Sequence, residues 1–338
     1  MTPEGVVERR DVVIVGAGPA GLAAAIAAQK AGLDYELIEK GALVNSIFHF
    51  PTSMTFFTTP ELLEIGAVPF VSPYEKPTRA EALRYYRRVA DIYALRVSLG
   101  EEVRAIRPEA GGAAPAFRLE TRTALGVRQR RARCIVVATG YYDHPNRLGV
   151  PGEDLPHVAH YYADAHALYR QRVVIVGGKN SAAIAALEAF RAGAAAVTLV
   201  HRRESLSDSI KYWIRPDIEN RIREGAIATR LLSHVVEIRA DDVLIDGPAG
   251  RESLPAETVL LLTGYHPDVE LLRGAGVRID PATLKPEHDP ETLESNVPGL
   301  FVAGSATAGH ETNRIFIETG RFHGEAAVRA LARYLVRG

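Results

Sequence analysis

The sequence has little cysteine and no excess of either charge. Its 338 residues include one cysteine, Cys134, and 40 Lys and Arg against 41 Asp and Glu, for a net charge of −1. One thiol excludes an intrachain disulfide, a zinc site built on several thiolates and a Cys-x-x-Cys redox pair. Balanced charge gives no global attraction to nucleic acid or to an anionic membrane. The nearest approach to a basic, aromatic nucleic-acid motif, residues 84–88, has the period of a surface helix.

Uninterrupted apolar runs are also scarce near the N-terminus. The longest one there, residues 12–28, is broken by glycines and a proline, so it is a poor transmembrane span. The first eleven residues carry several charges and lack the apolar core of a secretory signal. These features predict a soluble cytoplasmic enzyme. With 47% hydrophobic and 24% charged residues, the composition is that of a globular protein, and the length suggests two or three domains.

A dinucleotide-binding pattern opens the chain. A β-branched apolar run, residues 11–15, leads into a Gly-x-Gly-x-x-Gly motif, an Ala-rich helical stretch and a second strand at residues 35–38. In this pattern the first glycine permits a tight turn, the second lets the backbone approach a pyrophosphate, and the third lets the helix pack against the strand. An acid at the end of the second strand can bind ribose hydroxyls. The predicted cofactor-binding residues are therefore Gly16, Gly18, Pro19, Ala20, Gly21, Glu39 and Lys40.

A second unit of the same kind begins at residue 172. Its strand, residues 172–176, leads into a weaker glycine motif in which Lys179 takes the place of the middle glycine. A helix follows, and its first residues would face the phosphates of a nucleotide. The predicted binding residues of this loop are Gly177, Gly178, Lys179, Asn180 and Ser181.

The next strand, residues 197–200, ends in His201, Arg202 and Arg203 rather than in an acid. An acid would repel the extra phosphate of NADP, whereas paired guanidinium groups bind it with two hydrogen bonds each. The second site is therefore predicted to bind NADPH rather than NADH. Two dinucleotide folds in one chain imply one tightly held and one exchangeable cofactor. We predict FAD at the first site, with hydride passing from nicotinamide to flavin.

Further segments extend this pattern over the whole chain. Apolar strands end in Ala138-Thr139-Gly140 and in Thr263-Gly264, and Ala303-Gly304 precedes a long helical pattern at residues 315–337. This order resembles the flavoprotein disulfide reductases of the low-molecular-weight thioredoxin-reductase arrangement.

The resemblance implies an α/β fold with two Rossmann-like dinucleotide-binding domains. Residues 1–150 and 268–338 would form the FAD domain and residues 151–267 the inserted NADPH domain, with crossing strands at residues 149–152 and 264–267. Thioredoxin reductase itself is excluded because residues 160–164, just before the second glycine motif, contain no cysteine.

Longer segments carry a closer resemblance. They are residues 45–57, 59–66, 176–182 and 209–213, and Asn313 followed by residues 315–324. On these segments the chain resembles the YpdA-type bacillithiol disulfide reductases, in which lysine is the expected residue at position 179. The resemblance implies a homodimer or homotetramer without a metal, whose electron acceptor is a small-molecule disulfide or a small redox protein.

The resemblance also implies further cofactor contacts. Asn45, Ser46 and His49 would lie near the isoalloxazine or pyrophosphate, and Val103 would lie on the strand that holds adenine. His310 and His323 flank the segment expected along the flavin and are candidates for proton delivery. The remaining predicted cofactor-binding positions are Ala138, Thr139, Gly140, Gly264, Gly304, Ser305 and Ile315.

Two departures from the family pattern concern the chemistry directly. Relatives thought to act through a thiol carry cysteine where Ala20 stands, and Cys134 lies in an apolar strand, where a free cysteine behaves as a small hydrophobe. Ser305 replaces an aspartate that binds the FAD ribityl chain in many relatives. Either the flavin reduces a disulfide directly, or the acceptor differs. A ferredoxin- or flavodoxin-NADP reductase is therefore the alternative, and a non-catalytic NADPH/FAD sensor is a third.

Overall fold

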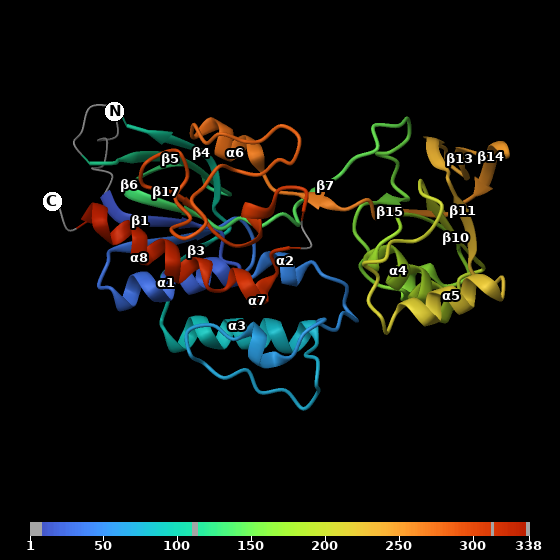
Figure 1. Ribbon diagram of the computed structural model, residues 1–338, viewed down its shortest axis with the longest axis horizontal. Coiled ribbons are helices and arrows are strands. Elements are labelled where there is room, and N and C mark those ends of the chain that lie inside the picture. Colours follow the sequence, from blue (N-terminus) through green and yellow to red (C-terminus); the bar gives the residue numbers. More distant parts are fainter. Residues whose placement is uncertain (1–8, 110–113, 312–313, 336–338) are drawn as a thin grey trace. The chain divides into compact units, whose positions relative to one another are not determined.

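The computed structural model describes residues 9–109, 114–311 and 314–335. Asn313 and the last residues of the predicted C-terminal helix lie outside these ranges. The chain divides into two compact units, Met1–His144 with Tyr265–Gly338, and Pro145–Gly264. Both are built from parallel sheets and helices, which confirms the predicted α/β class (Figure 1). Within the described residues, no helix combines the length and the apolar composition that crossing a bilayer requires.

The larger unit is organised around one sheet with the strand order β3-β2-β1-β6-β5-β4, in which β17 also pairs with β6. The parallel strands are β1 (Arg9–Val15), β2 (Tyr35–Glu39), β3 (Val97–Leu99), the second half of β6 (Gly126–Val137) and β17 (Leu300–Val302). The antiparallel strands β4 (Glu102–Pro108) and β5 (Phe117–Thr123) continue the sheet from the first half of β6. The carboxyl ends of β1, β2, β6 and β17 therefore share one edge, where ligands bind in such sheets.

The helical segments of this unit are α1 (Pro19–Lys30), α2 (Asn45–Phe48), η1 (Pro60–Leu63), α3 (Arg79–Ile92), α6 (Val269–Gly274), η3 (Gly304–Ala308), α7 (Ile317–Gly320) and α8 (His323–Leu335). The single helix predicted over residues 315–337 is therefore wrong, because α7 and α8 are separate. Gly320, a poor helix former, lies so close to the backbone of Gly304 that an added Cβ would be 3.2 Å from its Cα. The next residue, Arg321, donates from Nη1 to the carbonyl oxygens of Glu61 and Glu64.

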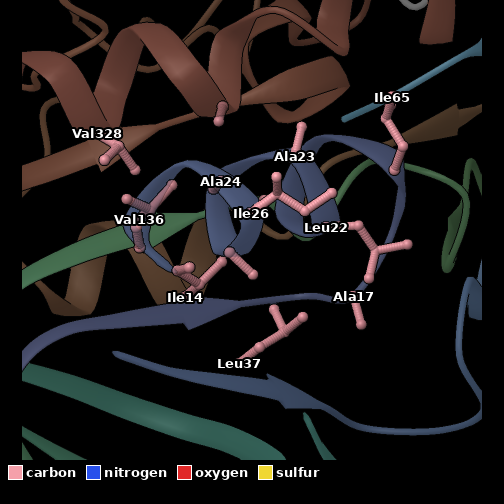
Figure 2. Packing of buried hydrophobic residues seen from close by; sticks show 14 of the residues in the cluster. Ile14, Ala17, Leu22, Ala23, Ala24, Ile26, Leu37, Ile65, Val136 and Val328 are labelled. Atoms are coloured by element: carbon pink, nitrogen blue, oxygen red, sulfur yellow. The ribbon is translucent and has the colours of Figure 1, made fainter. Parts of the chain in front are cut away.

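Small side chains bring α1 close to both of its neighbours. Figure 2 shows Leu22, Ala24 and Ile26 of α1 among buried residues of the sheet and of α8. An added Cβ on Gly324, in the first turn of α8, would collide with the carbonyl oxygen of Ala20 and the backbone of Ala24. The Ala-rich sequence of α1 thus explains how the two helices can touch along their backbones.

The smaller unit repeats the plan with the parallel strand order β11-β10-β9-β15-β8. Its elements are β8 (Val158–Ala159), η2 (His166–Leu168), β9 (Arg172–Val176), α4 (Asn180–Arg191), β10 (Ala196–His201), α5 (Arg215–Arg223), β11 (Ala228–Leu231) and β15 (Thr258–Leu261). An antiparallel sheet of β12 (His234–Ile238), β13 (Asp242–Gly247) and β14 (Gly250–Pro255) completes it.

The chain passes between the units at β7 (His144–Pro145) and β16 (Tyr265–His266), which pair with each other. The first crossing strand was expected at residues 149–152, and this expectation is wrong. Those residues pack inside the smaller unit: the Pro151 carbonyl accepts from Ile238 N–H at 2.9 Å, and an added Cβ on Gly152 would collide with Ile238 O. The unit boundaries accordingly fall at 144/145 and 264/265 rather than at 150/151 and 267/268.

We predict that Gly324→Ala destabilises the larger unit, because a methyl group there forces α8 away from α1. Overpacking of this kind lowers the free energy of unfolding by roughly 1–3 kcal/mol. Urea denaturation followed by circular dichroism measures the change. Arg329→Ala, at a 78% exposed position of the same helix, is the matched control and should shift stability by less than about 0.5 kcal/mol. Equal stability of the Gly324→Ala protein and the wild type would contradict the close approach.

Candidate functional site

The first glycine motif forms the turn between β1 and α1, and its three glycines have different surroundings. Gly16 has φ +101°, and an added Cβ would lie 2.6 Å from Ala138 O. An added Cβ on Gly21 would collide with Gly16 O, so this glycine allows α1 to pack against the turn. An added Cβ on Gly18 would meet nothing within 4 Å. The loop is therefore open only at Gly18, the glycine that lets a pyrophosphate approach, and Pro19 begins α1 beside it.

Glu39, at the end of β2, ties this loop to the next segment. Its carboxylate is 6% exposed and accepts from Ala17 N–H at 2.8 Å and from Gly41 N–H at 3.0 Å. Burial raises the pKa of this carboxyl, while the two backbone hydrogen bonds act in the opposite direction. Each oxygen keeps acceptor capacity for a further donor. The predicted ribose contact thus stays a prediction, and the structure adds that Glu39 orients the glycine loop. Lys40 pairs with Asp143 at 3.0 Å.

The segment after Glu39 is held against the same loop. Val44, which the sequence did not single out, is buried at φ +50° and donates its N–H to Ala17 O at 3.1 Å. A β-branched residue in this region is strained and needs surrounding contacts to hold it. The side chain of Asn45 accepts from Ala42 N–H at 3.1 Å, so it fixes the turn before α2. Ser46 lies in α2, half-buried, and His49 follows it, exposed.

A second group of predicted residues meets at the carboxyl ends of β6 and β17. Gly304 has φ +68°, and an added Cβ would lie 2.9 Å from the Cβ of Ala20. An added Cβ on Gly140 would lie 3.5 Å from the Ser305 hydroxyl oxygen. Thr139 Oγ1 is buried and has no hydrogen-bond partner among the described residues. A buried, unpaired hydroxyl beside small residues fits a polar ligand at this edge of the sheet.

His323 also belongs to this group. Its Nδ1 accepts a hydrogen bond from Gly304 N–H at 3.2 Å, which leaves the proton of a neutral ring on Nε2. Burial, and then His288, hold the pKa of this imidazole below its usual value. His310, the other proton-delivery candidate, is exposed, and its ring lies 6.3 Å from that of His266. Of the two, only His323 has a hydrogen bond to this group.

Three other predicted positions flank these contacts. The Cγ2 of Ile315 lies 3.4 Å from an added Cβ on Gly320, which itself approaches Gly304. Val103 is buried in β4, two residues after Glu101, whose N–H donates to Glu39 O at 2.9 Å. Ala138 lies directly against Gly16, because its carbonyl oxygen would be 2.6 Å from an added Cβ on that glycine.

In the smaller unit, His201 lies against the second glycine loop. An added Cβ on Gly178 would collide with the imidazole ring, so the ring occupies the space that a side chain there would need. His201 Nε2 is buried without a hydrogen-bond partner among the described residues. Burial first, and then Arg202 and Arg203, lower the pKa of this ring. The two arginines are exposed and form no ion pair within the described residues. The strand end therefore presents two free guanidinium groups and a neutral imidazole.

The side chain of Asn180 binds its own chain, and the predicted phosphate contact of this residue stays a prediction. Its Oδ1 accepts from Lys211 N–H at 2.9 Å, and its Nδ2 donates to Ser209 O at 3.1 Å. Since the amide is bound to the chain itself, the backbone N–H groups at the start of α4 are what can face a phosphate. Gly177, Lys179 and Ser181 surround this helix start, and both side chains are exposed. Gly264 follows β15 on the same side, two residues after Leu262, whose carbonyl oxygen would lie 2.6 Å from an added Cβ on Gly177; its own carbonyl accepts from Asn146 N–H at 2.9 Å.

Comparison with known proteins places this geometry in a family. Residues 13–304 match the family described as pyridine nucleotide-disulphide oxidoreductase. The chain belongs to this family. It is 43% identical to the bacilliredoxin reductase Bdr of Bacillus subtilis over 95% of this chain and 97% of that protein.

Two solved structures are also similar. The bacillithiol disulfide reductase Bdr (YpdA) of Bacillus cereus is 42% identical, with a TM-score of 0.93 over 96% of this chain and 99% of the other. That of Staphylococcus aureus is 37% identical, with a TM-score of 0.90 over 98% and 100%.

Membership of this pyridine nucleotide-disulphide oxidoreductase family confirms the resemblance to the YpdA-type reductases. It also confirms the predicted oxidoreductase activity and the flavin and nicotinamide cofactors. The residues described above fit both groups: an open glycine loop and an unpaired buried hydroxyl in the larger unit, and an unpaired imidazole with two free arginines in the smaller one. Among the described residues, no cluster of three or more His, Cys, Asp or Glu side chains could hold a metal ion.

The single thiol lies away from solvent. Cys134 is 0% exposed, in the part of β6 that pairs with Val12 of β1. Burial raises the pKa of this thiol to about 12. Because the thiolate is the reactive form, Cys134 is unsuited to exchange with a disulfide.

We predict that native protein does not react with Ellman's reagent at pH 8, where a pKa of about 12 leaves about one thiolate in ten thousand. The same protein in guanidinium chloride should release one equivalent of the chromophore per chain, because it contains one cysteine. Cys134→Ala should retain NADPH oxidation. Rapid labelling of the native protein, or loss of activity in a folded Cys134→Ala protein, would give the thiol a redox role after all.

Proposed function

We propose that this protein is an NADPH-dependent FAD oxidoreductase that reduces a low-molecular-weight thiol disulfide without a thiol of its own. The observation that carries the proposal is the combination of Ala20 at the first turn of α1 with a single cysteine buried in β6. The names of the similar proteins, a bacilliredoxin reductase and bacillithiol disulfide reductases, support a disulfide as acceptor. A homodimer or homotetramer and a cytoplasmic location stay predictions of the sequence.

In the larger unit, the chain holds and orients FAD. Backbone groups at Gly18 and the start of α1 face the pyrophosphate, and Glu39 keeps the loop in place while its free lone pairs take ribose hydroxyls. Thr139 and Ser305 supply hydroxyl groups at the carboxyl ends of β6 and β17. Bound FAD supplies a two-electron carrier between nicotinamide and disulfide.

In the smaller unit, Arg202 and Arg203 bind the 2′-phosphate of NADPH. Both guanidinium groups lack carboxylate partners among the described residues, so neither must break an ion pair to take the phosphate. His201 is neutral and fills the space over Gly178, which leaves the positive charge at the strand end to the arginines.

Reduction of a disulfide by NADPH consumes one proton from the medium and yields two thiols and NADP⁺. A group that holds a proton near the reacting sulfur assists departure of the thiolate. The geometry favours His323 over His310, because the hydrogen bond from Gly304 N–H to Nδ1 leaves the proton on Nε2. His323 is thus the candidate hydrogen-bond donor to the departing thiolate, and the proton itself comes from the medium.

The absence of an accessible thiol also fits the alternative, a ferredoxin- or flavodoxin-NADP reductase. Anaerobic NADPH oxidation by the FAD-loaded protein separates the two when bacillithiol disulfide, other thiol disulfides and an oxidised ferredoxin are offered in parallel. We expect turnover with a thiol disulfide at an unchanged rate in the Cys134→Ala protein. Turnover with ferredoxin alone would overturn disulfide reduction and establish the alternative.

The nucleotide preference has its own test. Replacing Arg202 and Arg203 by alanine should weaken NADPH binding about tenfold or more, the equivalent of about 1.4 kcal/mol for charge-assisted hydrogen bonds at an exposed site. NADH binding should change little, since it lacks the 2′-phosphate. Stopped-flow flavin reduction gives both dissociation constants. Arg251→Ala, an exposed arginine of β14, is the control. An equal loss for both nucleotides would contradict the 2′-phosphate role.

A further inference from the structure

The segment that joins β10 to α5 is folded back onto the second glycine loop. Ser207 N–H donates to Gly178 O at 2.8 Å, and both groups of the Asn180 amide bind the backbone of Ser209 and Lys211. We call residues 205–214 the strap. Its family-like motif, residues 209–213, has no place in the function described so far.

The strap is a compact loop with a fixed conformation. Arg215, the first residue of α5, donates from Nη2 to Ser207 O at 2.8 Å and so closes the loop at its base. The Ser207 and Ser209 hydroxyl oxygens lie 2.8 Å apart. Ile210 and Ile214 are 4% and 8% exposed and anchor the inner side of the strap in the unit. The backbone that carries its outer side chains is therefore ordered before any ligand binds.

Two of those outer side chains are aromatic. Tyr212 is 79% exposed and Trp213 is 37% exposed, with ring centroids 4.8 Å apart and ring planes perpendicular. Tyr212 is therefore largely open to a ligand, and Trp213 presents part of its ring surface to solvent. Aromatic side chains on an ordered backbone bind planar rings at a low cost in conformational entropy, because only their few side-chain torsions have to be fixed.

The position of the strap indicates which planar ring this is. Arg202 and Arg203 are separated from the strap by Glu204 alone, and Gly178 and Asn180 hold the strap at the start of α4. In a nucleotide bound by these groups, the 2′-phosphate belongs to the adenosine half. Adenine is the planar group attached to that ribose.

We propose that Tyr212 and Trp213 form the adenine-binding face of the nucleotide site and that the Asn180 amide is the positioning group that holds them there. The proposal rests on the proposed function for the presence of a dinucleotide in this unit. It assigns adenine recognition to the strap and recognition of the 2′-phosphate to the arginines, so the two contributions are separable.

The test uses two small probes on the FAD-loaded protein: adenosine 2′,5′-bisphosphate, and ADP, which lacks the 2′-phosphate. Isothermal titration calorimetry gives the dissociation constants. Tyr212→Ala and Trp213→Leu should each bind both probes about tenfold more weakly, within the range found for loss of a base–aromatic stack. Tyr212→Phe and Trp213→Phe keep an aromatic face and should bind within about twofold of the wild type.

Trp213 supplies a second readout, because it is the only tryptophan of the chain. Its emission should change when adenosine 2′,5′-bisphosphate, which does not reduce flavin, is added to the wild type. The Trp213→Phe protein should show no such change although it binds the probe. Tyr74→Ala, which removes a 61% exposed tyrosine of the larger unit, is the matched control and should bind as the wild type does.

Asn180→Ala tests the positioning role. It removes the hydrogen bonds that hold the backbone of residues 209–211 and should weaken the binding of both probes. The tryptophan emission of the ligand-free protein should shift toward that of a solvated indole. An Asn180→Ala protein whose binding and emission match the wild type would overturn that part of the proposal.

The adenine-binding face would be overturned if Tyr212→Ala and Trp213→Leu bound both probes within about twofold of the wild type. It would also be overturned if the tryptophan emission of the wild type did not change on addition of adenosine 2′,5′-bisphosphate. Failure of the proposed NADPH preference would give a different result. The wild type would bind ADP as tightly as the bisphosphate, and the protein with both Arg202→Ala and Arg203→Ala would bind each probe as tightly as the wild type does. The dissociation constants of the aromatic variants for ADP would then still test the adenine-binding face.

Discussion

The site in the larger unit depends on how closely backbone segments approach the first turn of α1. Gly21 lies against Gly16, Gly304 against Ala20, and Gly324 against Ala20 and Ala24, each at a separation that leaves no room for a side chain. Because these contacts bring β1, β17 and α8 to one helix end, they also bring the glycine loop, the Ser305 hydroxyl and His323 together. Short-range packing between small residues thus positions groups that lie far apart in the sequence.

The two dinucleotide units share a plan but differ in what their second strand presents. In the larger unit that strand ends in Glu39, whose carboxylate is bonded to the loop and whose neighbour Lys40 is paired with Asp143. In the smaller unit it ends in His201, a neutral ring against Gly178, followed by two arginines that form no ion pair with the residues the structure describes. One strand end therefore offers hydrogen-bond acceptors, and the other offers positive charge.

The redox chemistry is constrained by the surroundings of two small residues. Ala20 lies in the first turn of α1, beside Gly304, but has no reactive group. Cys134 has the reactive group but lies within the core of the sheet, with a raised thiol pKa. A mixed disulfide with the protein thus has no site in the native chain. The remaining polar group beside Gly304 with a defined proton position is His323. This arrangement favours electron transfer from flavin to acceptor without a protein thiol.

The sequence alone determined the α/β class, the two glycine loops and the chemistry of both strand ends, because these depend on local patterns: β-branched strands, glycine spacing and the residue that follows a strand. Only the tertiary structure decided the role of Asn180, the strained backbone at Val44, the break between α7 and α8, the position of the first crossing strand and the hydrogen bond of His323. Each of these depends on which distant backbone group lies within hydrogen-bonding or contact distance, as Gly304 does for His323 and Ile238 for Gly152. The packing of the whole unit determines these partners, and a periodic pattern along the sequence does not predict them.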